Sequence, residues 1–168
     1  MKLHRVPAGA VPVKRLNEAL NVCLSLRDVF GPLALRDALD RMTPPQGSGA
    51  EGLAGVPKAF LRTCILAVKT HPAQLAGPVA RRVLPRLVDV GVWRDADLWK
   101  GFLMYCKILG AGDDACFAAA LMLPAPQLQK LLAFAPKLKL PLKRHAEKLV
   151  KARDTDGVVA GCLKLLGL

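Results

Sequence analysis

The chain has 168 residues, of which 52% are apolar and only 5% aromatic, and it carries a formal net charge of +12. A chain of this length can bury one substantial core, and a core built mainly from Leu, Val and Ala favours packed helices over strands. Its longest apolar run, Ala115 to Leu123, is far shorter than the roughly 20 residues that span a bilayer and no signal-peptide core is present, so we expect a soluble, non-secreted protein.

The first regular element is predicted to be a helix over residues 13 to 26, after a disordered or extended start at residues 1 to 12. Apolar residues recur at helical spacing in this segment. A second helix should begin at Pro32, which is tolerated in a first turn, and end at Met42. We expect the two helices to form an antiparallel pair.

Residues 43 to 55 are rich in Pro, Gly and Ser, so we predict a flexible surface loop without regular structure. A third, amphipathic helix is predicted from Val56 to Thr70. It should end there because His71, the residue before Pro72, avoids the helical region. A fourth is predicted from Gln74 to Val90. Pro85 should kink it, since proline removes one backbone hydrogen bond.

The fifth helix should be capped by Asp95 or Asp97, and it carries the densest aromatic group of the sequence, at Trp99 and Phe102. Gly101 lies inside this helix at an intrinsic cost of about 1 kcal/mol relative to alanine. A glycine at such a position indicates close approach of a neighbouring helix.

Asp113 and Asp114 precede an Ala-rich run, so we expect them at a helix N-terminus, where the helix dipole favours negative charge. Two more helices are predicted, over residues 126 to 134 and 138 to 153, and residues 154 to 168 are predicted to be a weak helix or a frayed tail. The longer helix should pack an apolar stripe inward. Its basic face consists of Lys137, Lys139, Lys143, Arg144, Lys148 and Lys151.

About seven or eight short helices joined by short loops predict an all-α fold of stacked antiparallel helical hairpins, like an α-solenoid or HEAT-like stack. We expect one helical domain over residues 13 to 153, with the flexible loop at 43 to 55 inside it.

Several motifs follow one another in an order that is typical of one family. They are LWKGF at 98–102, Cys106, LMLPAPQL at 121–128 and PKLKLPLKRH at 136–145, with a softer match at Asn21, Cys23, Arg27 and Val29. With these motifs, the chain resembles the symplekin C-terminal family over roughly residues 13 to 150. The resemblance assigns structural roles to Leu98, Gly101, Phe102, Cys106, Leu123, Pro124, Gln127, Leu128, Pro136, Leu138, Pro141, Leu142 and His145.

The resemblance implies a non-catalytic scaffold of pre-mRNA 3′-end cleavage and polyadenylation in the nucleus. Its implied partners are the C-terminal regions of the cleavage endonuclease and of the inactive homologue in the cleavage and polyadenylation specificity factor. Trp99 and the six basic residues are our candidate partner-binding residues, although Trp99 is equally consistent with a core position. The alternative is a helical-repeat RNA-binding module that uses the basic helix. No aromatic side chain lies among its lysines to stack bases, so we expect RNA affinity to be secondary and nonspecific.

Nothing in the sequence indicates catalysis. Ser25 and Ser48 are the only serines, and neither lies in a G-x-S-x-G turn. The histidines are scattered, without metal ligands at suitable spacing. Five isolated cysteines fit neither a disulfide framework nor a zinc site, so we expect buried thiols. We therefore expect no enzyme, no metal, no cofactor and no small-molecule substrate.

Overall fold

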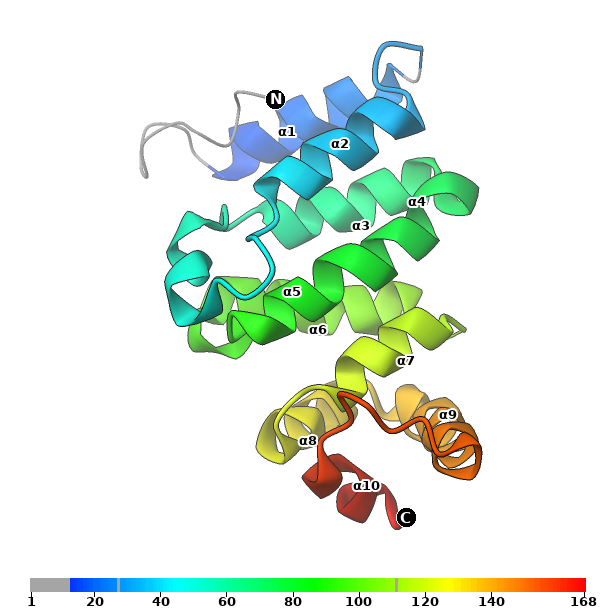
Figure 1. Ribbon diagram of the computed structural model, residues 1–168. Helices are drawn as coiled ribbons and strands as arrows, with labels where there is room; N and C mark the ends of the chain where they lie inside the picture. The colour runs from blue at the N-terminus through cyan, green and yellow to red at the C-terminus, as the bar shows by residue number, and fades with distance from the viewer. Residues whose placement is uncertain (1–12, 27, 111) are drawn as a thin grey trace. The chain divides into compact units, whose positions relative to one another are not determined.

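The computed structural model describes residues 13–26, 28–110 and 112–168, and all regular structure in these ranges is helical (Figure 1). The prediction for residues 1 to 12 falls outside them. The described residues form ten α-helices, which is more than the seven or eight that we expected. The fourth predicted helix contains two α-helices joined by a π-helical segment, and the C-terminal segment forms a helix of its own.

The chain divides into two compact units, which meet in sequence between Gly101 and Phe102. We call them the N-terminal unit and the C-terminal unit. Helix α6 (Ala96–Leu109) contributes its first residues to one unit and the rest to the other.

Helices α1 (Val13–Ser25) and α2 (Pro32–Met42) open the N-terminal unit close to the predicted bounds. Pro32 stands in the first turn of α2, where its missing N–H would have had no partner within the helix. Both helices bury leucines at a spacing of four residues: Leu20 and Leu24 in α1, Leu35 and Leu39 in α2.

The segment after α2 contains more structure than we predicted. Gly49–Gly55 forms a 3₁₀-helix, η1, so the expectation of a loop without regular structure is wrong. The segment is held by distant residues: η1 contacts α5, and the Gly47 N–H donates to Asp89 Oδ2 at 3.1 Å. Local composition reflects only local propensity, and it contains no sign of a contact formed across 42 residues.

Helix α3 (Phe60–Thr70) begins later than Val56, where we predicted its start. Val56 has extended dihedral angles, φ −81° and ψ 121°, because the residue before a proline, here Pro57, avoids the helical region. A turn from Pro57 to Phe60 then leads into the helix, with the Phe60 N–H donating to the Pro57 carbonyl at 2.8 Å.

The fourth predicted helix is a continuous run of three segments: α4 (Pro72–Pro78), a π-helical segment η2 (Val79–Val83) and α5 (Leu84–Asp89). The Leu84 N–H donates to the carbonyl of Val79, five residues earlier, as in a π-helix. Pro85 follows directly and has no N–H with which to continue the α-helical ladder. The interruption that we predicted at Pro85 therefore takes the form of a widened turn.

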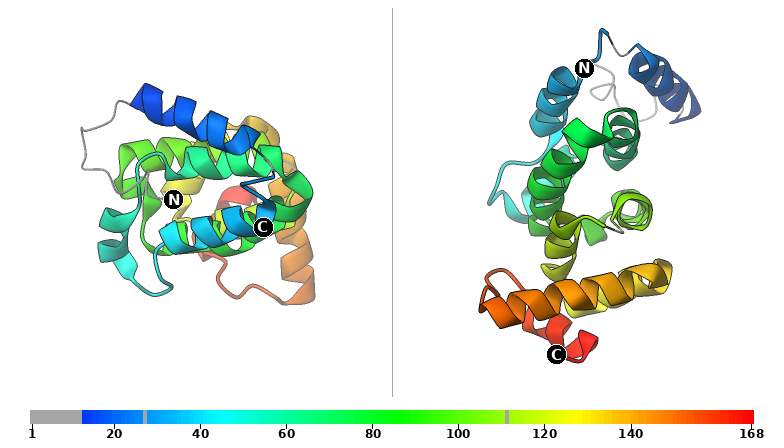
Figure 2. Two further views of the ribbon diagram at one scale, coloured as in Figure 1. Left: turned by 90° about the horizontal axis from the view of Figure 1, so that it is seen from above. Right: turned by 90° about the vertical axis from the view of Figure 1, so that its right-hand side faces the viewer.

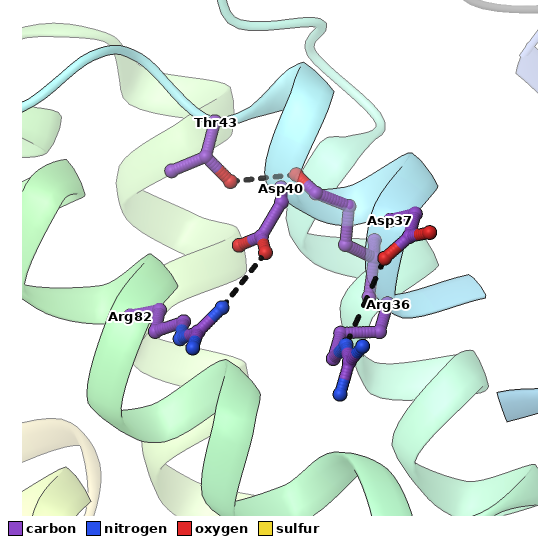
Figure 3. A network of polar contacts seen from close by, with 6 residues as sticks. Arg36, Asp37, Asp40, Thr43 and Arg82 are labelled. Carbon is purple, nitrogen blue, oxygen red and sulfur yellow. Dashed lines mark hydrogen bonds and ion pairs between the residues drawn. The ribbon is translucent and has the colours of Figure 1, made fainter. Parts of the chain in front are cut away.

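An ion pair joins this run to α2: Arg82 Nη1 lies 3.2 Å from Asp40 Oδ2 (Figure 3). The Thr43 hydroxyl donates to the Leu39 carbonyl at 2.7 Å. Figure 3 also shows Arg36 beside Asp37. Exposed ion pairs contribute about 0–1 kcal/mol each. The apolar contact of α2 with η2 and α4 must therefore supply most of the stabilisation here.

The N-terminal unit is a stack of antiparallel helices. Helix α1 packs against α3, while α2 packs against α3, α4 and η2. Helices α1, α2, α3 and the α4–α5 run alternate in direction (Figure 1), and a side view shows them in two layers (Figure 2). The all-α, stacked-hairpin prediction is confirmed.

The start of α6 agrees with two further predictions. Asp95 is the cap, since its Oδ1 accepts hydrogen bonds from the N–H groups of Asp97 and Leu98, both at 2.9 Å. A Cβ at Gly101 would lie 2.8 Å from Leu61 Cβ of α3. The close approach of a neighbouring helix is therefore confirmed, and glycine is required there for space.

The C-terminal unit contains α7 (Asp114–Leu121), α8 (Ala125–Phe134), the 3₁₀-helix η4 (Pro136–Leu138), α9 (Lys139–Ala152) and α10 (Ala160–Leu166). As predicted, Asp113 caps α7, with its Oδ1 accepting from the Ala115 N–H at 2.9 Å.

Helix α10 resolves the alternative that we left open for the last residues. It packs on α8 and α9, and it buries Cys162 and Leu166. The Cys162 thiol donates to the Leu123 carbonyl at 3.1 Å, and the Val159 N–H donates to the Leu121 carbonyl at the same distance. The segment is a short helix anchored by apolar burial, which a frayed tail would lack.

Candidate protein-binding surfaces

Helix α9 has two faces, as its apolar stripe predicted. Leu142 and Ala146 are fully buried, and Leu138 of η4 continues the same side. Packing against α7 and α10 covers this side. The other side of the helix therefore carries almost all of its charge.

The six candidate basic residues form what we call the basic surface. Lys143 is half-buried, and the other five are exposed: Lys137, Lys139, Arg144, Lys148 and Lys151. None of the six forms an ion pair with another described residue. Their positive field is therefore not neutralised by salt bridges within the described part of the chain, and it is available to an anionic partner.

His145 fixes α9 to α7. Its Nδ1 lies 3.2 Å from Asp114 Oδ1, and its ring centroid lies 5.7 Å from that of Phe117. Its Nε2 is buried and has no hydrogen-bond partner among the described residues. The contacts to α7 give His145 a packing role.

The remaining motif residues are mostly core residues. Trp99 is half-buried and belongs to the N-terminal unit. Among the motif positions, the buried residues are Leu98, Phe102, Cys106, Leu123, Leu128, Leu138 and Leu142; Gly101, Pro124, Gln127, Pro141 and His145 are half-buried, and Pro136 is exposed.

The N-terminal unit exposes four large apolar side chains at and near the connection between α1 and α2; we did not predict this from the sequence, and we call these residues the apolar surface. Val22, Leu26, Val29 and Leu33 lie within twelve residues and are 50% to 68% exposed. A groove of about 320 Å³ lies beside α1, lined by Asn21, Leu24, Ser25, Leu66 and Thr70. A helical pattern marks apolar residues as one face of a helix, but it does not say which of them a neighbour covers.

The cysteines are free thiols, and four of the five are buried. Cys106 and Cys116 form a pair, with 3.7 Å between their Sγ atoms. A hydrogen bond with the Cys116 thiol and burial together raise the pKa of Cys106 well above its ordinary value. Burial likewise raises the pKa of Cys64 and of Cys162. These groups stay protonated at neutral pH and are poor nucleophiles.

The described residues offer neither a metal site nor a membrane span. No three His, Cys, Asp or Glu side chains gather there in a way that could hold a metal ion. No helix there has the length and apolar character needed to cross a membrane.

Comparison with known proteins gives one family. The family model described as "Symplekin tight junction protein C terminal" matches residues 1–134. The match stops at the end of α8, so the motif at 136–145 and the basic surface lie beyond the matched residues. No solved structure was found to match the chain.

Proposed function

The chain belongs to the symplekin C-terminal family, and from this premise we propose that it is a protein-binding scaffold of mRNA 3′-end processing. The observation that carries the proposal is the family match, which spans residues 1–134 of 168. The family implies a scaffold role in 3′-end processing. Stacked helices agree with that role, because they expose extended surfaces to which other chains bind.

We propose two specific partners: the C-terminal regions of the cleavage endonuclease and of its inactive homologue in the cleavage and polyadenylation specificity factor. Together with them, the chain would act in the nucleus, on pre-mRNA cleavage and polyadenylation. Support comes from the motif succession from Leu98 to Leu128 and from the two exposed surfaces. An apolar surface and a basic surface on one chain are suited to partner segments of different chemistry.

We also propose that the chain has no catalytic activity of its own. Its titratable groups support this. The thiols of Cys64, Cys106 and Cys162 are held protonated, and Asp95 and Asp113 are occupied as helix caps. Residues committed in this way contribute to stability and are poorly placed to transfer protons or attack a substrate.

Co-expression tests the scaffold role. The full chain is produced with the C-terminal regions of both proposed partners, and the mixture is resolved by size-exclusion chromatography at moderate salt. We expect all three chains in one peak. Each partner region expressed alone with the chain is the control for stoichiometry. Elution of the full chain by itself, with the partner regions folded and present, would rule out these partners.

The basic surface is the observation that favours the alternative, an RNA-binding module. Residues 125 to 168 hold nine Lys and Arg against three acids, a net charge of 9 − 3 = +6. Phosphate contacts by these cations would give affinity that falls steeply with salt. A fluorescence titration with oligonucleotides separates the two functions, since sequence-selective binding would favour the alternative and uniform, salt-sensitive binding would favour the scaffold.

A further inference from the structure

Helix α9 combines charge with two exposed apolar side chains, Leu140 and the less exposed Val150, at 43%. Leu140 is 58% exposed, although it lies on a helix whose other leucines turn inward. At 3.6 residues per turn, residues 143, 144, 147 and 151 share its face. Lys143 and Arg144 therefore lie one turn from Leu140, while Glu147, the single acid of that face, and Lys151 lie two and three turns along it.

This composition favours a polypeptide over the other anionic partners. Phosphate contacts would explain the cations but not an exposed leucine, and the ring of His145 in α9 packs on Phe117, where it cannot stack a base. A lipid surface would require a broad apolar face, whereas Leu142 and Ala146 of this helix are buried against α7 and α10.

We propose that this face of α9 is a docking site for an acidic, amphipathic segment of a partner polypeptide, with Leu140 as its apolar contact. The inference rests on the scaffold function proposed above and adds to it the chemistry of one partner. Charge complementarity selects the occupant: two cations one turn from Leu140, and a third farther along the same face, fit a segment whose Asp and Glu residues flank an apolar side chain. The leucine contributes affinity by burial, and the cations contribute encounter rate and register.

A fluorescent synthetic peptide tests the proposal with the full chain. The peptide forms a helix that presents Leu on one face, with Glu at neighbouring positions, and a matched peptide replaces Leu with Ala. We expect the Leu peptide to bind more tightly by about fivefold or more, because only it buries an apolar side chain. Equal affinity for the two peptides would overturn the proposal.

Two variants of the chain test the same contact from the other side. Leu140→Ala should lower the affinity for the Leu peptide by about fivefold and leave the affinity for the Ala peptide unchanged. The double charge reversal, Arg144→Glu with Lys151→Glu, should lower the affinity for both peptides by about tenfold at low salt. Loss of binding only in the double reversal, with no effect of Leu140→Ala, would reduce the site to nonspecific charge and contradict the proposal.

Helix α3 offers a matched control. Arg62 and Lys69 are exposed, lie seven residues apart as Arg144 and Lys151 do, and give the same change in net charge when both are replaced by Glu. We expect this control variant to lose less than about threefold in affinity. An equal loss in both double variants would mean that overall charge alone attracts the peptide. Circular dichroism of each variant verifies its helical content.

Two outcomes separate this proposal from the scaffold function. If the endonuclease regions co-elute with the chain but tolerate Leu140→Ala and the α9 reversal, the scaffold stands and the docking site on α9 is wrong. If the acidic peptide binds through Leu140 while the endonuclease regions do not bind, the site stands and the named partners are wrong. Binding of oligouridine RNA that outcompetes the peptide would assign the face to nucleic acid and overturn the proposal.

Discussion

The two exposed surfaces of this chain lie on the same kind of helical scaffold but differ in chemistry, since one is apolar and the other is basic. In the N-terminal unit, Val22, Leu26, Val29 and Leu33 expose aliphatic carbon near the ends of two helices. In the C-terminal unit, α9 exposes a row of cations beside Leu140. Contacts to the first surface should be insensitive to salt, and contacts to the second should weaken with it. The helical stack thus fixes where the exposed side chains lie, while their residue types decide what kind of partner they can bind.

The largest effect should come from the difference between the two faces of α9. Leu142→Ala removes a buried side chain and should lower the free energy of unfolding by about 2–5 kcal/mol, whereas Leu140→Ala, on the exposed face, should change it by less than about 0.5 kcal/mol. Urea denaturation followed by circular dichroism measures both. Similar losses in the two variants would mean that the outer face is also covered.

The next effect contrasts a crowded glycine with an open one. Gly101→Ala places a Cβ against Leu61 and should destabilise the N-terminal unit by about 1–3 kcal/mol, despite the better helix propensity of alanine. Gly112→Ala is the control, because a Cβ at Gly112 would have no other atom within 4 Å. Thermal unfolding should show a lower Tm for Gly101→Ala alone. An unchanged Tm would contradict the close packing of α6 on α3.

Alkaline pH should reveal the buried thiols in both units. The pKa values of Cys64 and Cys106 are raised in the folded chain, while in the unfolded chain thiols ionise near about 8.5. The protonated thiols of Cys64 and Cys106 contribute their full stabilisation at pH values below the pKa of an unfolded thiol. Above it, the unfolded state loses protons that the folded state keeps, so the free energy of unfolding falls by about 1 kcal/mol per thiol at pH 9.5. Denaturation at pH 7.5 and 9.5 measures the fall.

A cysteine variant supplies the control for this pH effect. Cys64→Ala should be less stable at both pH values, because it leaves a small cavity, but its loss between them should be smaller by the share of one thiol. A slope identical to that of the parent chain would exclude Cys64 as a source of the pH dependence.

A smaller effect compares the helix caps of the two units. Asp95 accepts two backbone hydrogen bonds, whereas Asp113 accepts one. Substitution of a cap by alanine costs about 0.5–2 kcal/mol, so Asp95→Ala should lie toward the upper end of that range and Asp113→Ala toward the lower. Chemical denaturation of both variants gives the order. The reverse order would show that local cap geometry does not control the cost.

The smallest effect is expected at the apolar surface itself. Val29→Ser and Leu33→Ser remove exposed carbon and should change the free energy of unfolding by no more than about 0.5 kcal/mol. Denaturation of the double variant checks this. A loss of several kcal/mol would mean that these side chains belong to a core.

The features that the sequence predicted well are those governed by neighbouring residues. The bounds of α2, the cap at Asp113 and the space requirement at Gly101 all follow from residue type and short spacing. The same local reasoning would have given the late start of α3, because Pro57 constrains Val56 just as Pro72 constrains the residue before it.

The features that it missed depend on residues far apart in the chain. The 3₁₀-helix at Gly49–Gly55 is held against α5, and the exposure of Val29 or Leu140 depends on whether another element covers that side. Periodicity identifies an apolar position without identifying its neighbour. For the same reason, the candidate surface on α9 was predicted by its charges, while its leucine was not.

The π-helical turn at Val79–Val83 has a consequence for side-chain phase. Leu75, Val79, Val83 and Leu87 are all buried, at steps of four residues. Along a regular α-helix, each such step rotates a side chain by about 40° away from its starting line. A π turn holds more residues per revolution, so it cancels part of this drift and keeps the row aligned toward its neighbours. The widened turn thus lets a helix whose buried residues recur every four positions keep them in one row that faces the neighbouring helices.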